Sequence, residues 1–546
     1  MKAHPMRERK PPPISSTNSP SWVADLQERI RLLAETPVGR YGIPLAILIA
    51  SLLLGAWTFD PKLSISGDNT EFIILARSMA EGKGLTYINA PDLTPATKYP
   101  FGFPLLLAPL ERLFPGQWVP MKWLVVVLLS LGMPIFYWLI RERLNVVPAL
   151  AATIFCLTAG RTLQNSGPLL LDYGHQVMSE IPYMTFSLFA LLLVEKGVRT
   201  PGIVRNYRFI GGFLITMWAC YIRSIGLVLV AAVATYLFVR RDWRRALAFS
   251  SAALLTWLPW HLRNRAVGGG SSYFRQLLMV NPYRPEQGFL DFSSLIERLF
   301  DNANFYLSFY LPVNLWPWTE GYPNVLNPLS PLVVVLMVYA AVLCLRRRQD
   351  LLLFIYSAFY LGTVLVWPWI GDRFLAPIVP MLAFFLVRLS LDAAARLERL
   401  KAGVVGLLLC WALFFSILFG NINSARHLAG LGRGDYADYL SAWRNYQDAG
   451  EWLRENTSTG SIVVCRKGLW MYIVSGRRCI GFPFDAPEKV ISHMEREKVD
   501  FVVVESLGFP QTMRFLLPTI ARYPERFLVL WQKKDPPTHI LRFLHE

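Results

Sequence analysis

The 546-residue sequence has few of the residues that build metal centres or disulfide frameworks, with six cysteines and seven histidines. Cys and His recur nowhere at the spacing of metal ligands, which argues against a structural metal centre of the Cys/His kind. Four cysteines fall in long apolar segments and are expected to pack there as apolar side chains: Cys156, Cys220, Cys344 and Cys410.

Acidic residues are also scarce, since 38 Asp and Glu stand against 55 Lys and Arg, for a net charge of +17. In a soluble protein this excess would suggest nucleic-acid binding, but no nucleic-acid motif is present. The cations instead form short clusters between apolar segments, where such clusters set the orientation of a membrane protein. We therefore expect membrane lipid and no nucleic acid as partner.

Apolar residues are abundant, at 53% of the chain with a mean hydropathy of +0.35, which is too apolar for an ordinary soluble protein. The N-terminal residues 1–40 are polar, and no small-residue cleavage site follows the first apolar run, so a cleavable signal peptide is not expected. Residues 1–40 are predicted to form a cytoplasmic tail, disordered over 1–20 and with a short amphipathic helix over 21–36.

A helix that crosses a bilayer needs roughly 20 apolar residues. Eleven segments come close to this length: 41–59, 118–140, 146–161, 181–195, 209–222, 224–239, 246–262, 328–345, 351–369, 373–390 and 402–420. Residues 103–114 are apolar but short and proline-rich, and are interpreted as an interfacial or re-entrant piece. The prediction is an α-helical polytopic membrane protein with about 11 transmembrane helices over residues 41–420.

The charges between these segments predict their orientation. With the N-terminus inside, every inner turn is basic and no outer turn has such a cluster. The inner basic residues are Arg141 and Arg143; Lys196, Arg199, Arg205 and Arg208; Arg240, Arg241, Arg244 and Arg245; Arg346, Arg347 and Arg348; and Arg388, Arg396, Arg399 and Lys401. The outer side then receives the loops 60–117 and 263–327 and a C-terminal domain, 421–546.

The C-terminal domain has apolar runs too short to span a membrane. Residues 461–464 and 499–504 resemble buried strands, and helical stretches lie around 436–455 and 486–497, so the domain is predicted to be a small extracytoplasmic α/β domain. Cys465 and Cys479 both fall within it. A disulfide is possible in an oxidising compartment, and the sequence leaves its formation open.

The first outer loop contains the most informative carboxylate, Asp68, which directly follows the first long apolar segment. An ionisable group at a membrane boundary is a functional hypothesis by default. Asp68 precedes a helix-like stretch over 72–84 whose apolar positions suit a helix lying on the membrane, so it could instead act only as a helix N-cap. Glu71 lies one turn further on and is a supporting candidate.

Other charges are predicted on the same side. Asp172 and Glu180 both precede the segment at 181–195, although a Glu before a proline also suits a helix cap. Arg223, Arg263 and Arg373 lie in or beside short outer turns. Each arginine could be a snorkelling anchor, yet arginine also binds phosphate through two parallel hydrogen bonds, and its place in outer turns opposes the usual charge bias.

Carboxylates and arginines beside apolar helices suit transfer from a lipid-linked phosphate. The arginines would hold the phosphate leaving group, and a carboxylate would accept the proton of an attacking hydroxyl. A nucleotide-activated donor would meet the cytoplasmic side, where this chain has only small loops.

Five stretches, in this order, resemble the membrane glycosyltransferases of the GT-C fold, in particular bacterial relatives of dolichyl-phosphate-mannose protein mannosyltransferase and the lipid A aminoarabinose transferase. They are Gly67-Asp68-Asn69 with the helix ending Ala80-Glu81-Gly82-Lys83-Gly84; Tyr99-Pro100-Phe101-Gly102-Phe103-Pro104-Leu105; Met178-Ser179-Glu180-Ile181-Pro182-Tyr183; Leu258-Pro259-Trp260 with Arg263-Asn264; and Asp372-Arg373-Phe374-Leu375-Ala376-Pro377. The likeness extends over about residues 45–390.

The resemblance implies an inverting transfer of a sugar from a polyprenyl-phosphate donor to an acceptor hydroxyl, with Asp68 as the catalytic base. Many members have two adjacent acidic residues there, whereas here Asn69 follows Asp68, which leaves the role of Glu71 open. Some members bind a divalent metal and others do not, so a metal stays possible and no metal ligand is assigned.

The sequence thus predicts a glycosyltransferase on the outer face of a bacterial inner membrane, acting on a protein, lipid or glycan acceptor. A transporter or flippase for a lipid-linked sugar is the alternative, but transporters concentrate ionisable groups at the bilayer midplane, and here the centres of the apolar segments are nearly free of acids. A catalytically inactive scaffold that presents the C-terminal domain is a third possibility, opposed by Asp68 and its neighbours.

Overall fold

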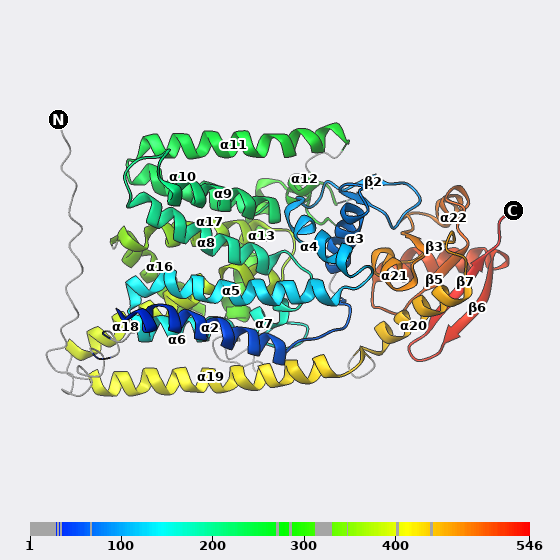
Figure 1. The fold of residues 1–546 in the computed structure, drawn as a ribbon. Helices are drawn as coiled ribbons and strands as arrows, with labels where there is room; N and C mark the ends of the chain where they lie inside the picture. The colour runs from blue at the N-terminus through cyan, green and yellow to red at the C-terminus, as the bar shows by residue number, and fades with distance from the viewer. Residues whose placement is uncertain are drawn as a thin grey trace.

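The computed structural model describes residues 29, 32, 35–65, 68–268, 272–282, 287–311, 330–346, 348–399, 403–436 and 440–546. Figure 1 shows a bundle of helices lying side by side, with a small layer of loop elements at one end and an α/β unit beyond that layer. The predicted tail and its amphipathic helix lie largely outside the described residues, as do residues 312–327 of the loop 263–327.

Each of the eleven predicted apolar segments coincides with a helix in the described part of the chain. The helices are α2 (Pro37–Trp57), α5 (Val119–Leu144), α6 (Val146–Thr158), α8 (Glu180–Val198), α9 (Tyr207–Ile222), α10 (Gly226–Val239), α11 (Trp243–Ala266), α16 (Ser330–Arg346), α17 (Leu351–Val366), α18 (Val379–Arg399) and α19 (Gly403–Arg433).

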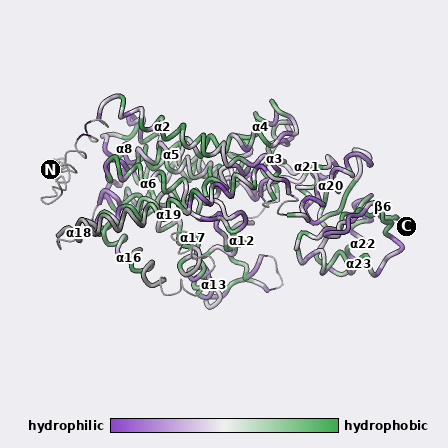
Figure 2. The backbone as a smooth tube through the Cα atoms, turned by 90° about the horizontal axis from the view of Figure 1, so that it is seen from below, coloured by the Kyte–Doolittle hydropathy of each residue, from purple (hydrophilic) through white to green (hydrophobic). Residues whose placement is uncertain are grey.

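Five stretches of these helices are long and apolar enough to cross a membrane by length and composition, and three shorter apolar helices accompany them in the described residues. The five are Pro37–Trp57, Val119–Leu144, Glu180–Val198, Arg348–Val366 and Asp372–Ala393. Hydrophobic residues run along the bundle helices, and hydrophilic residues gather at both ends of the bundle and in the α/β unit (Figure 2). The chain is therefore a multi-pass membrane protein.

The basic turns that join the helices meet at the end of the bundle away from the α/β unit. Arg143, only 3% exposed, contacts Glu195 and lies 3.0 Å from Asp350 through its Nε atom. Arg388 donates to the backbone carbonyl of Arg143 at 2.9 Å. These four residues, which we call the inner cluster, tie the ends of α5 and α8 and the start of α17 to the middle of α18, where unpaired charges would be costly.

The first outer loop forms α3 (Asn69–Ala80), the two-stranded pair β1 (Thr86–Tyr87) and β2 (Thr94–Pro95), and α4 (Gly102–Leu113). The predicted helix forms as α3, and nine of its twelve residues are buried, which is more than the single buried face that was predicted. The reason is that α3 is covered on one side by α4 and on another by α21 (Gly468–Ser475) of the α/β unit. A helix covered by two elements needs no polar face.

The other loop elements are α7 (Leu169–Gly174), α12 (Ser272–Leu278), α13 (Phe292–Asn304), the π-helix η2 (Phe305–Tyr310) and two 3-10 helices, η5 (Arg348–Asp350) and η6 (Asp372–Ile378). The last of these occupies the short turn before α18. Its carboxylate at Asp372 accepts hydrogen bonds from the Tyr173 hydroxyl at 2.9 Å and from the Leu163 amide at 2.7 Å. The turn that carries Arg373 is thereby fixed to the loop before α8.

Beyond α19 the chain forms an α/β unit around a five-stranded sheet of order β4-β3-β5-β7-β6. The strands are β3 (Ile462–Val464), β4 (Arg478–Ile480), β5 (Phe501–Val504), β6 (Phe527–Lys533) and β7 (Thr538–Phe543), with β3 parallel to β4 and β5 and the rest antiparallel. The helices are α20 (Ser441–Asn456), α21, α22 (Pro487–Arg496), the π-helix η8 (Thr512–Leu516), α23 (Leu517–Arg522) and η9 (Pro524–Arg526).

Two features of this unit differ from the sequence expectation. The α19 helix continues through Arg433, beyond the predicted boundary at residue 421. Strands β4, β6 and β7 were not predicted, whereas β3 and β5 coincide with the two expected strands. Cys465 and Cys479 are neighbours across β3 and β4, and both thiols are buried and free.

The α/β unit is attached to the first outer loop by specific polar contacts. At the edge strand β4, the Cys479 amide donates to the Asn89 carbonyl at 2.7 Å, and the Asn89 side chain donates back to the Cys479 carbonyl at 2.9 Å. Lys62 donates to the carbonyls of Leu431 and Gly434 at 2.8 and 2.9 Å. These bonds satisfy backbone groups that an open sheet edge and a helix end would otherwise leave free.

Candidate functional site

Asp68 lies at the N-cap position of α3, but its side chain makes no capping hydrogen bond. Its Oδ2 atom instead accepts a hydrogen bond from Arg373 Nη1 at 2.6 Å, and its Oδ1 atom lies 3.5 Å from the ammonium of Lys98. The two bonded residues are 305 positions apart in the chain. The structure therefore brings the predicted base and one predicted phosphate ligand into direct contact.

Glu71, one turn along α3, shares the same cation. Lys98 donates to Glu71 Oε2 at 2.9 Å, and the hydroxyl of Tyr87 donates to Glu71 Oε1. Lys98 thus lies between two carboxylates, while its ammonium also stands 4.4 Å from the ring centre of Tyr99. Tyr99 begins one of the family-like stretches, but the sequence assigned no role to it, and neither Tyr87 nor Lys98, which directly precedes that stretch, was singled out.

The charges of this group are strongly coupled. Burial alone would raise the pKa of Asp68, but the positive charges of Arg373 and Lys98 outweigh it and hold that pKa well below its usual range. The pKa of Glu71 is raised, chiefly by burial, with Lys98 opposing. Asp68 is therefore an ionised carboxylate at neutral pH and Glu71 the more readily protonated of the two.

Glu180 and Arg223 form a second pair beside the first. The Arg223 Nη1 atom lies 2.9 Å from Glu180 Oε1 and donates to Ser179 Oγ at 2.9 Å. Glu180 is fully buried in the first turn of α8, where a negative charge also suits the helix dipole. The negative charge of Glu180 also acts on Arg373, so the two pairs interact electrostatically.

Arg263 is engaged differently from the other two arginines. From the C-terminal turn of α11 it donates to the carbonyls of Ala96 and Leu85, and it stacks 5.3 Å over Trp260. These contacts hold the first outer loop close to Lys98, which is two residues beyond Ala96. Arg263 therefore braces the loop in this structure, and its role as a phosphate ligand stays a prediction.

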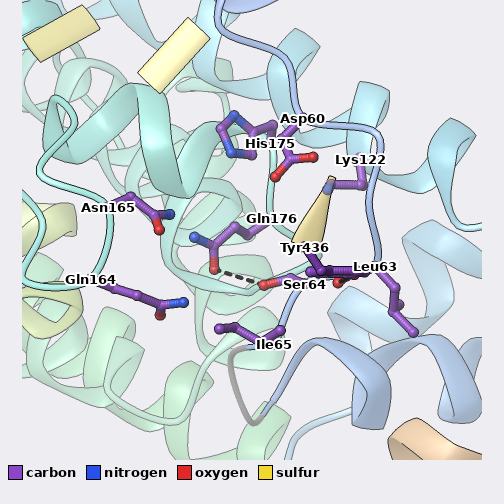
Figure 3. Close-up of a pocket in the computed structure, with 10 residues that line it drawn as sticks. All are labelled: Asp60, Leu63, Ser64, Ile65, Lys122, Gln164, Asn165, His175, Gln176 and Tyr436. Atoms are coloured by element: carbon purple, nitrogen blue, oxygen red, sulfur yellow. Dashed lines mark hydrogen bonds between the residues drawn. The ribbon is translucent and has the colours of Figure 1, made fainter. Parts of the chain in front are cut away.

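Asp172 does not join Asp68. Its carboxylate accepts hydrogen bonds from Thr162, from Asn165 at 3.0 Å and from Gln176 at 3.1 Å, and burial raises its pKa to about 6. Next to it is a polar pocket (Figure 3) lined by Asp60, Leu63, Ser64, Ile65, Lys122, Gln164, Asn165, His175, Gln176 and Tyr436. Asp172 belongs to this second polar group and not to the candidate site.

In the described part of the chain, no three His, Cys, Asp or Glu side chains lie close enough together to hold a metal ion. Asp68 and Glu71 are the carboxylates of the site, and the positions that a cation would take beside them are occupied by Arg373 and Lys98. We therefore derive no step through a metal.

A bundle of apolar helices, with carboxylates and arginines in the loops at one end and an α/β unit beyond them, is the arrangement of the GT-C fold. Comparison with solved structures confirms this fold, which the family-like stretches predicted. No protein-family model matches the chain, and no curated protein matches it by sequence.

Two solved structures illustrate the likeness. One is the Archaeoglobus fulgidus oligosaccharyltransferase tethered with an acceptor peptide, at a TM-score of 0.58 and 12% identity over 92% of this chain and 74% of that one. The other is ArnT from Cupriavidus metallidurans bound to undecaprenyl phosphate, at a TM-score of 0.57 and 13% identity over 93% of this chain and 98% of that one. At this identity the likeness shows the fold.

Proposed function

We propose that this protein is an inverting glycosyltransferase that moves a sugar from a polyprenyl-phosphate donor to an acceptor hydroxyl. The observation that supports it most strongly is the contact of Asp68 with Arg373 and Lys98, because it places a carboxylate base beside two cations that suit a phosphate. The structurally similar ArnT binds undecaprenyl phosphate, which is a polyprenyl phosphate of this kind.

The chemistry assigns a role to each group. The acceptor oxygen attacks the anomeric carbon, the bond from that carbon to the phosphate oxygen breaks, and the hydroxyl proton passes to Asp68. Arg373 and Lys98 stabilise the negative charge that grows on the leaving phosphate, with Arg223 as a further phosphate ligand. The lipid tail of the donor lies against the apolar helices.

The low pKa of Asp68 fits this sequence of events. In the free protein Arg373 and Lys98 hold the carboxylate in its ionised form. When the donor phosphate binds to the same cations, its negative charge offsets theirs, so the proton affinity of Asp68 rises as the substrate arrives. The base then becomes stronger only when there is a sugar to transfer.

The location follows from the same arrangement. We propose that the site and the α/β unit face the periplasm of a bacterial inner membrane and that the basic turns face the cytoplasm, in line with the charge bias of the turns. The eleven apolar helices would then be the spans. The alternative, a transporter of a lipid-linked sugar, is less well supported because the described charges gather at the two ends of the bundle and not at its middle.

The direct test replaces Asp68 by Asn in the full chain and compares the glycans and lipids of the cell envelope with those of a deletion strain. A carboxamide cannot accept the proton, so we expect the product to fall by about 100-fold or more while the protein stays folded and inserted. Glu81→Gln is the matched control, since Glu81 is a half-exposed acid of the same loop paired only with Lys83 among the described contacts. Full activity of Asp68→Asn would refute the proposal.

A further inference from the structure

The α/β unit places a second basic group next to the candidate site. Its helix α21 lies on the side of α3 that faces away from the bundle helices (Figure 1), and Arg77 of α3 stacks 5.9 Å over Tyr472 of α21. The same edge of the unit is bonded to Asn89 of the first outer loop. Arg466 and Lys467 directly precede α21.

The Lys467 ammonium is held against an aromatic ring. It stands 4.4 Å from the ring centre of Phe509, and in the described part of the chain it makes no hydrogen bond and no ion pair. Arg466 stacks 5.0 Å from the same ring and 5.5 Å from Phe484, and its only polar contact among the described residues is a 3.3 Å bond to Gln511. Aromatic rings position the two cations without neutralising them.

The electrostatics link this pair to the site. Burial and the neighbouring Arg466 lower the pKa of Lys467 to about 8. The charges of Asp68 and Glu505 oppose this shift, and that of Lys98 adds to it. Holding an unpaired, half-buried ammonium beside another cation is costly. Such a cost is typical of binding positions, where an anionic ligand supplies the missing charge.

We propose that Lys467, with Arg466, binds an anionic group of the acceptor, such as a phosphate or carboxylate, on the side of Asp68 away from the membrane helices. This inference rests on the proposed function and names the substrate class for it: an acceptor that carries an oxyanion near the hydroxyl it offers. Arg373 and Arg223 come from the helix bundle and suit the donor phosphate, whereas Lys467 comes from the α/β unit.

A binding experiment on the full chain in lipid nanodiscs tests the anion site without an assay of turnover. Lysines are acetylated with and without inorganic phosphate, and the rate at each lysine is read by mass spectrometry. We expect saturating phosphate to slow modification of Lys467 by about tenfold, as for a charge-assisted bond, and to leave the exposed Lys489 of α22 unchanged. An unchanged rate at Lys467 would overturn the proposal.

A second arm separates the two sources of an anion. Undecaprenyl phosphate in the nanodisc should leave the acetylation of Lys467 unchanged if the residue serves the acceptor. If undecaprenyl phosphate slows it as strongly as inorganic phosphate does, Lys467 faces the donor and the assignment to the acceptor is overturned.

Variants in the deletion strain complete the test. We expect Lys467→Ala to lower the envelope product about tenfold, Lys467→Arg to restore most of it, and Lys489→Ala to have no effect. The thermal midpoint of purified Lys467→Ala should match that of the wild type. If Lys467→Ala makes as much product as the wild type while Asp68→Asn makes little, this inference is wrong and the proposed function stands. If both variants make as much product as the wild type, the proposed function is wrong as well.

Discussion

The two ends of the helix bundle hold charges in opposite ways. In the inner cluster Arg143, Glu195 and Asp350 are all less than 10% exposed and paired with one another. At the end next to the α/β unit, Arg373 is 29% exposed and Lys98 is 35% exposed, although both contact carboxylates. The cations Arg143 and Arg388 of the inner cluster, at 3% and 15%, are thus less exposed than Arg373 and Lys98.

The difference separates a structural role from a binding role. A buried ion network holds helices together because removing one partner leaves an uncompensated charge, but it has no room for a substrate. A partly exposed network can exchange its internal contacts for contacts with a bound anion at small cost. Paired charges in a membrane protein therefore indicate function only where solvent and ligand reach them.

The largest expected effect is on stability at the inner cluster. Arg143→Leu removes the cation closest to both acids. It leaves Glu195 with Arg199 at 3.5 Å and Asp350 with Arg388 at 3.9 Å, and it should lower the free energy of unfolding by about 3 kcal/mol or more. Thermal unfolding in detergent measures this, and Arg240→Leu, an exposed arginine at the same end, is the control with a change below about 1 kcal/mol. The remaining folded Arg143→Leu protein should still bind undecaprenyl phosphate normally. A stable Arg143→Leu variant that no longer binds undecaprenyl phosphate would show that the inner cluster has the binding role.

The next effect is on the pH dependence of stability near Asp172. Its folded pKa of about 6 lies above the ordinary value of 3.8, so its stabilising contribution is complete below pH 3.8 and is lost as the pH rises through 6. The loss amounts to about 3 kcal/mol. Asp172→Asn should therefore lose less stability than the wild type between pH 4 and 7 in thermal unfolding. Parallel profiles would show that Asp172 does not titrate in this range.

Donor binding should change at the open end. Arg373→Ala removes a charge-assisted hydrogen-bond donor and should weaken the binding of undecaprenyl phosphate by about tenfold to a hundredfold, with little change in thermal midpoint. Titration of nanodisc-embedded protein measures the affinity. Arg112→Ala is the matched control, because Arg112 is an exposed arginine of α4 in the same loop. Equal affinity in both variants would remove Arg373 from the phosphate site.

The smallest expected effect concerns the attachment of the α/β unit. Asn89→Ala removes the side-chain bond to the Cys479 carbonyl and should destabilise that edge by about 1 kcal/mol. Faster hydrogen exchange of the amides in β4, compared with Asn456→Ala at the exposed end of α20, would report it. No change in exchange would mean that the other contacts with the loop suffice.

The sequence predicts the parts of this molecule that depend on local patterns. The lengths of the apolar segments predicted the eleven helices, and two short apolar runs predicted β3 and β5. The sequence placed Asp68 and Arg373 on the same side of the membrane only as a hypothesis. It did not predict that they touch, because local patterns do not specify contacts between distant segments.

Contacts made by covering elements were the least predictable. The sequence of α3 predicts a surface helix. Its burial could not be predicted because α21, which covers it, is almost 400 residues away in the chain. Strand β4 has three residues and is held by pairing with β3, so it has no strong pattern of its own. Lys98 and Lys467 are isolated lysines in the sequence. Their roles depend on which residues contact them in the folded protein.

The central claim is that Asp68, Arg373 and Lys98 form one binding site for a lipid-linked phosphate. An experimental structure of the full chain with undecaprenyl phosphate tests it most directly. We predict the phosphate within hydrogen-bonding distance of Arg373 and Lys98, beside the Asp68 carboxylate, with the lipid tail along the bundle helices. A phosphate bound at the inner end, near Lys196 and Arg199, would contradict the account.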